Sequence, residues 1–136
     1  MKLVRALLCL ALLSTSPAFA ARSSVPMAEL DNLPITSASG KPPSSEQIRK
    51  AIVQGAARSH FSASVQPGNK LKLTYSKRDH SLVMEVSFTP KTYSIKYVDS
   101  TNLGYGMEGG KPVIHPRANG WLNKLRQSID RQLNQI

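Results

Sequence analysis

Three short runs between Lys70 and Ser100 alternate apolar and polar residues, and brief turns separate them. The apolar positions are Leu71, Leu73 and Tyr75, then Leu82, Met84, Val86 and Phe88, then Tyr93, Ile95 and Tyr97. A β-strand sends successive side chains to opposite faces, so each run has one apolar face. The connecting turns are too short for a crossover, which favours antiparallel pairing. The pattern predicts a three-stranded meander with one face that needs a cover.

Two amphipathic helices flank this meander in the sequence. Ser44-Ser45-Glu46-Gln47 matches a capping box, which predicts a helix from there to about Arg58. Pro116 suits the first turn of a final helix. The apolar stripe of that helix consists of Trp121, Leu122, Leu125, Ile129, Leu133 and Ile136.

A short edge strand over His60 to Gln66 extends the predicted meander to four strands. The expected fold is therefore α+β in two layers. It has an N-terminal helix, a three- to four-stranded antiparallel meander and a C-terminal helix, with both helices on one sheet face.

The first 20 residues have the pattern of a secretory signal peptide. Lys2 and Arg5 precede a short apolar run, and Ala18-Phe19-Ala20 forms a small-x-small cleavage site. An anchor helix and acylation of Cys9 are the alternatives, but Leu8 stands where a lipoprotein signal has a small residue. Cleavage near Ala20 predicts a periplasmic or secreted protein. It also removes Cys9, the only cysteine, so the mature chain has no disulfide.

Composition then divides the remaining chain into two parts. Residues 21–43 are rich in Ser, Pro and Ala, which predicts a flexible N-terminal tether. Residues 44–136 are expected to form one α+β domain. Within it, Asp99 to Ile114 contains several glycines and is predicted to be a long loop, a kind of segment that often carries function.

The charge is strongly basic. Without Lys2 and Arg5, the formal net charge of +10 becomes +8. Lys72 and Lys96 occupy polar positions of the strands, which predicts a basic outer sheet face. After export, such a face meets anionic envelope lipid, lipopolysaccharide or an acidic protein, and nucleic acid is not an expected partner. A merely solubilising surface is the alternative.

The long loop and the start of the last helix hold the other candidate residues: Asp99, Ser100, Asn102, Tyr105, His115, Asn119 and Trp121. Tyr105 and Trp121 could line a shallow ligand pocket with Asn102 and Asn119. Asp99, Ser100 and His115 could form a hydrolytic triad, although no Gly-x-Ser-x-Gly elbow supports it. Roles in turns, caps and core packing are the alternatives for all of them. No metal-ligand spacing or cofactor motif is recognisable, so neither is expected.

A resemblance adds to this interpretation. The segments Tyr93 to Tyr97, Asp99 to Leu103, Ile114-His115-Pro116 and Asn119-Gly120-Trp121 resemble those of a family of small exported proteins of Gram-negative bacteria, many described only as lipoproteins. The resemblance covers roughly Ile48 to Leu133 and implies an envelope location, without implying an activity.

Together, these observations favour a non-catalytic binding or interaction module of the cell envelope with a basic sheet face. A small hydrolase that uses Asp99, Ser100 and His115 is one alternative. A subunit of an envelope assembly is the other.

Overall fold

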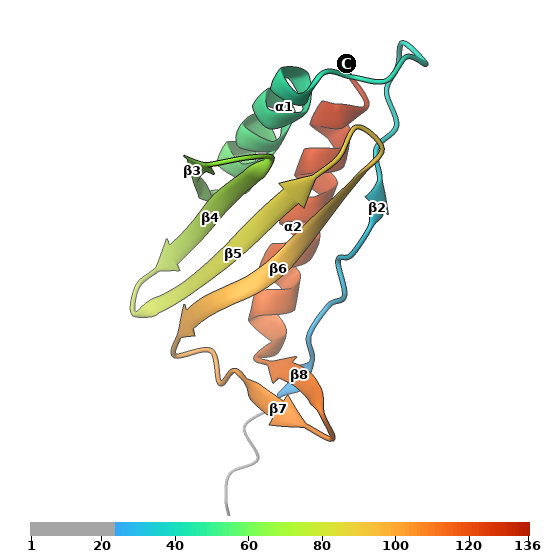
Figure 1. Ribbon diagram of the computed structural model, residues 1–136. Helices are drawn as coiled ribbons and strands as arrows, with labels where there is room; N and C mark the ends of the chain where they lie inside the picture. Colours follow the sequence, from blue (N-terminus) through green and yellow to red (C-terminus); the bar gives the residue numbers. More distant parts are fainter. Residues whose placement is uncertain (1–23) are drawn as a thin grey trace, which may run out of the picture.

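The computed structural model describes residues 24–136, and the predicted signal peptide lies outside these residues. In this part of the chain, two helices and two antiparallel sheets make an α+β fold, as the sequence predicted (Figure 1). In chain order the elements are β1 (Val25–Pro26), β2 (Leu33–Pro34), α1 (Ser45–Arg58), β3 (Ser62–Gln66), β4 (Lys70–Lys77), β5 (His80–Phe88), β6 (Thr92–Thr101), β7 (Gly106–Glu108), β8 (Lys111–Ile114) and α2 (Pro116–Leu133). Within residues 24–136, no helix has both the length and the apolar character that crossing a bilayer requires.

The larger sheet has the strand order β2-β6-β5-β4-β3. Its centre is the predicted meander, and β3 is the predicted edge strand. The register between β5 and β6 shifts once, because Met84 lies opposite Tyr97 whereas Val83 lies opposite Asp99. Val98 is therefore the extra residue of a β-bulge, a feature that bends a strand and re-aims the side chains that follow.

Both helices lie behind the five-stranded sheet in Figure 1. The contacts of one cross-strand pair give the same arrangement. Phe88 and Tyr93 lie opposite each other in β5 and β6, and such partners point to the same face of a sheet. The Arg49 guanidinium of α1 lies over the Phe88 ring, while the Tyr93 hydroxyl donates to Asp130 of α2.

One hydrophobic core lies between the sheet and the helices. Its members come from every layer of the fold, and most are fully buried. The largest are Tyr93, Ile48, Ile52, Leu71, Leu73, Leu82, Met84, Leu103, Ile114, Leu122, Leu125 and Ile129. The alternating apolar positions of the sheet and the apolar stripe of α2 supply most of this set, so the sequence pattern identified the core correctly.

The flexible tether was predicted for residues 21–43, of which 21–23 lie outside the described residues, and the prediction is wrong for residues 24–35. Residues 24–35, here called the strap, run alongside β6 on one side of the molecule (Figure 1). Ile95 donates its backbone N–H to the carbonyl of Leu30 at 2.7 Å, and Leu33 pairs with Tyr93. Met27 and Leu30 are buried. The strap is ordered because it covers apolar core and completes a sheet edge, two tertiary gains that a Ser- and Pro-rich composition does not reveal.

The predicted loop from Asp99 to Ile114 is also partly wrong. Strand β6 continues to Thr101, and β7 and β8 form a hairpin whose turn contains Gly109 and Gly110, both with positive φ. Strand β8 also pairs with β1 of the strap, giving the small sheet the order β1-β8-β7. The glycines are required by a tight turn, and they do not mark a long mobile excursion.

Candidate functional site

The three side chains of the predicted hydrolytic triad hydrogen-bond to other groups. The Ser100 hydroxyl lies 2.7 Å from the Tyr97 hydroxyl, and the Asp99 carboxylate accepts from the Ser100 backbone N–H. His115 is the N-cap of α2, where its Nδ1 accepts from the Arg117 N–H at 3.1 Å. Among the described residues, no hydrogen bond joins His115 to Ser100 or to Asp99. These contacts are those of a bulged strand, which contains Asp99 and Ser100, and of a helix cap.

Asn102 and Asn119 hold backbone segments together. Asn102, which has a positive φ, donates its Nδ2 to the Asp79 carbonyl at 2.6 Å and so fixes the end of β6 to the β4–β5 turn. Asn119 accepts from the Ala28 N–H at 2.9 Å and donates to the Pro26 carbonyl at 2.8 Å. Its side-chain amide therefore attaches the strap to α2 by bonding one backbone N–H and one backbone carbonyl of the strap, as the backbone of a neighbouring strand does.

Tyr105 and Trp121 line different hollows. Tyr105 stacks on Tyr97 with the ring centroids 3.7 Å apart, beside the strap. Trp121 packs on Tyr75 of β4, with a centroid distance of 4.4 Å. The structure therefore separates the two rings that the sequence placed in one pocket.

Of the two lysines of the predicted basic sheet face, one forms an ion pair within the described residues and the other does not. Lys96 forms an ion pair with Asp31 of the strap at 3.1 Å. Lys72 lies opposite Glu85 in the sheet register, but the ion pair of Glu85 is with Lys70, at 3.8 Å. Asp31 belongs to the strap, which the strand pattern did not place beside Lys96. Within the described residues, the outer sheet face therefore keeps Lys72 as an exposed lysine without an ion pair, while the charge of Lys96 is paired.

A larger group of Lys and Arg side chains without ion pairs in the described residues lies around Trp121. Two adjoining hollows of about 490 and 280 Å³ share Trp121 and Lys77 in their linings. We call the pair of hollows the cationic groove. Its Lys and Arg residues are Arg58, Lys77, Arg78, Arg117, Lys124 and Arg131, and all are exposed. They come from the end of α1, from β4 and its turn, and from α2.

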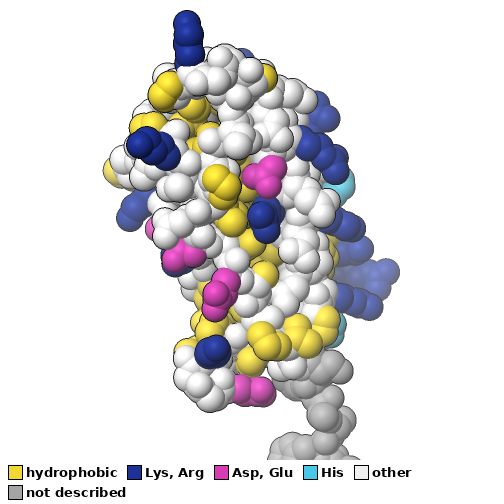
Figure 2. All heavy atoms as spheres, turned by 90° about the vertical axis from the view of Figure 1, so that its right-hand side faces the viewer, with side chains coloured by type: hydrophobic (Ala, Val, Ile, Leu, Met, Phe, Trp, Pro, Cys, Tyr) yellow, Lys and Arg dark blue, Asp and Glu magenta, His cyan; other side chains and the backbone are white. Residues whose placement is uncertain are grey.

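The charge of the cationic groove is not neutralised within residues 24–136. Its six Lys and Arg side chains take part in none of the ion pairs formed there. The one carboxylate in the lining, Asp79, lies 3.0 Å from Nδ1 of His80. His60 is a further member of the lining. Figure 2 shows Lys, Arg and His side chains along the right-hand flank, which is the helix side of Figure 1.

The groove offers a specific kind of recognition. Arginine guanidinium groups bind phosphate and carboxylate oxygens through paired N–H donors, and lysines add point charges. Trp121 and Tyr75 form an aromatic floor that can contact an apolar group next to those anions. Among residues 24–136, no three His, Cys, Asp or Glu side chains are grouped so as to hold a metal ion.

Sequence reasoning identified Trp121 but missed its charged neighbours. Lys124 lies three residues after Trp121 in the same helix, and Arg131 lies seven residues after Lys124, which is the spacing of one helix face. That signal was present in the sequence. No signal in the sequence places Arg58 and Lys77 near Trp121, because their position depends on how α1 and β4 pack beside α2.

Comparisons of the chain with protein-family models, with curated proteins and with solved structures find no match.

Proposed function

We propose that this protein is a non-catalytic module of the bacterial cell envelope that binds anionic, phosphate-bearing amphiphiles through the cationic groove. The observation that carries the proposal is the set of six exposed, unpaired Lys and Arg side chains around Trp121. The signal-peptide pattern of residues 1–20 and the family resemblance support an envelope location, where anionic phospholipid and lipopolysaccharide are accessible.

The aromatic floor favours an amphiphile over a purely polar polyanion. Trp and Tyr are enriched where proteins meet a membrane interface, because one part of the ring system is apolar and another is polar. Each Lys or Arg close to an anionic membrane surface contributes about 1 kcal/mol of binding free energy. A groove with six of them supports firm attachment at low ionic strength and weaker attachment as salt screens the charges.

Trp121 provides a direct test, because it is the only tryptophan in the chain. We expect its fluorescence to change when the mature protein is titrated with vesicles of phosphatidylglycerol and phosphatidylcholine, and not with phosphatidylcholine alone. The affinity should fall steeply between 50 mM and 500 mM salt. A titration with purified lipopolysaccharide asks whether the same groove accepts that phosphate source.

Matched charge reversals locate the binding surface. Lys124→Glu with Arg131→Glu should weaken vesicle binding by about thirtyfold or more, since two cations near the surface contribute roughly 2 kcal/mol. Lys72→Glu with Lys91→Glu makes the same change in net charge on exposed residues outside the groove. Equal losses in the two variants would show a diffuse charge effect and overturn the proposal. So would binding to polyglutamate without binding to vesicles, which would indicate an acidic protein partner.

A further inference from the structure

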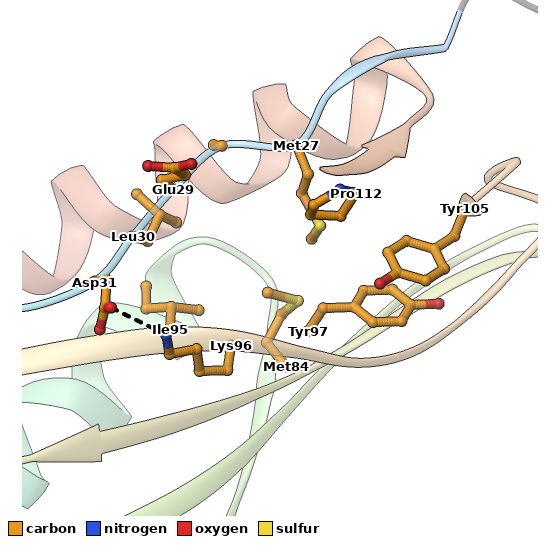
Figure 3. A pocket seen from close by; sticks show the side chains of 11 residues that line it. Met27, Glu29, Leu30, Asp31, Met84, Ile95, Lys96, Tyr97, Tyr105 and Pro112 are labelled. Carbon is orange, nitrogen blue, oxygen red and sulfur yellow. Dashed lines mark ion pairs between the residues drawn. The ribbon is translucent and has the colours of Figure 1, made fainter. Parts of the chain in front are cut away.

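A second cavity, of about 390 Å³, opens where the strap separates from β6 (Figure 3). Leu30 is held to the edge of β6 by the Ile95 N–H, and Met27 is held to the hairpin because its N–H donates to the Pro112 carbonyl at 3.0 Å. Between these two attachments the strap spans the space without pairing with a strand. The volume lies in the range of pockets that hold small organic molecules.

The walls of this cavity are mostly apolar. They comprise Met27, Leu30, Met84, Ile95, Tyr97, Tyr105 and Pro112, and Figure 3 shows the two tyrosine rings stacked at one end with Met84 beside them. Thioether side chains adapt their shape to an apolar guest. The exposed face of a tyrosine ring attracts cations as well as apolar groups. Tyr105 is 39% exposed, so part of its surface is free to contact a ligand.

The rim of the cavity is acidic, in contrast to the rest of this basic protein. Its charged residues are Glu29, Asp31 and Lys96. The Ser94 hydroxyl and Lys96 both hydrogen-bond to the Asp31 carboxylate, and they lower the pKa of that group. Asp31 and Lys96 therefore neutralise each other. Glu29, which is exposed and forms no ion pair within the described part of the chain, leaves one net negative charge among the charged residues of the lining.

We propose that this cavity binds an amphiphilic organic cation, with its apolar body against Met84 and the two tyrosine rings and its ammonium group beside Glu29. The argument is one of charge complementarity. An ammonium group would pair with the Glu29 carboxylate while the apolar body extends toward the tyrosine rings at the other end of the cavity (Figure 3), whereas a carboxylate or phosphate group would be repelled by Glu29. The proposal is independent of the cationic groove, which shares none of these residues.

Three probes with the same eight-carbon chain test this preference: octylammonium, octanol and octanoate. Calorimetric titration of the mature protein should give octylammonium an affinity at least tenfold higher than that of octanol, with octanoate the weakest. Amide chemical-shift changes should map to Leu30, Lys96 and Tyr105. Equal or tighter binding of octanoate, or shifts that map to the cationic groove, would overturn the proposal.

Two variants separate the contribution of the charge from that of the cavity. Glu29→Gln should remove the higher affinity of octylammonium over octanol and leave the affinity for octanol unchanged. Glu108→Gln is the control, because Glu108 lies on the hairpin and outside the cavity lining, and this variant should keep the higher affinity for octylammonium. Ala28→Phe should fill the cavity and abolish binding of all three probes. If Ala28→Phe fails to fold, the Glu29→Gln comparison decides alone: an unchanged preference would refute the assigned role of Glu29.

Discussion

Gly55 in α1 lies directly against the backbone of Ile129 in α2. A β carbon placed on Gly55 would lie 2.7 Å from the α carbon and the amide nitrogen of Ile129, closer than such atoms approach in proteins. The two helices pack this closely because Gly55 has no side chain. A glycine that weakens an isolated helix therefore allows the contact that holds the helical layer together.

We expect Gly55→Ala to destabilise the protein, although alanine is the better helix former. The added methyl group forces the helices apart, and overpacking of this kind costs about 1–3 kcal/mol. Urea unfolding followed by circular dichroism measures the change. Gly120→Ala is the matched control, because a β carbon there meets no atom within 4 Å. It should raise the free energy of unfolding by up to about 1 kcal/mol. Equal responses of the two variants would contradict the close helix contact.

The Tyr93–Asp130 hydrogen bond predicts a loss of stability at alkaline pH. Tyr93 is buried and donates to the Asp130 carboxylate at 2.5 Å. Burial, and next the contact with Asp130, raise the pKa of Tyr93 well above its usual range. Its contribution to stability is therefore complete below about pH 10, where tyrosine ionises in the unfolded chain, and is lost as the pH rises further.

We expect the free energy of unfolding to fall above pH 10 by up to about 1.4 kcal/mol per pH unit from this one group. Tyr93→Phe should lose about 1.5 kcal/mol near neutral pH and should show a shallower alkaline slope. Urea unfolding at a series of pH values measures both quantities. Tyr75→Phe is the control, since it keeps the ring without altering the Asp130 contact. An unchanged alkaline slope in Tyr93→Phe would refute the assignment.

Removing the Asn119 amide should loosen the strap. Asn119→Ala deletes the hydrogen bonds to Pro26 and Ala28 and leaves these backbone groups without their protein partner. We expect a cost of about 1–3 kcal/mol, concentrated in the strap, and faster hydrogen exchange at the Ala28 amide. Asn123→Ala changes an exposed residue of the same helix and should have little effect. Unchanged exchange at Ala28 would show that the strap is held by other contacts.

The capping box of α1 gives a prediction that the sequence alone allowed. The Ser44 hydroxyl accepts from the Gln47 N–H at 3.2 Å, and the Gln47 side chain accepts from the Ser44 N–H at 2.9 Å. Ser44→Ala should therefore cost about 1 kcal/mol in thermal or urea unfolding. Ser45→Ala, one position inside the helix, should be neutral or stabilising because alanine has the higher helix propensity.

Local chemistry was enough to predict much of this fold. The alternation between Lys70 and Ser100 predicted the meander, and Ser44 and Pro116 marked the beginnings of α1 and α2. These features depend on residues close together in the sequence, because side-chain direction in a strand and hydrogen bonding at a helix start are local properties.

Only the tertiary structure decided which surfaces are available for binding. Lys96 was predicted to lie on a basic face, but the strap places Asp31 beside it. Arg58 and Lys77 lie near Trp121 because α1 and β4 pack next to α2. The strap itself is ordered by contacts with β6, β8 and Asn119. Such pairings join residues as much as 93 positions apart, as in Asn119 with Pro26. Sequence patterns of short period carry no information about them, because these contacts are chosen by the packing of the whole domain.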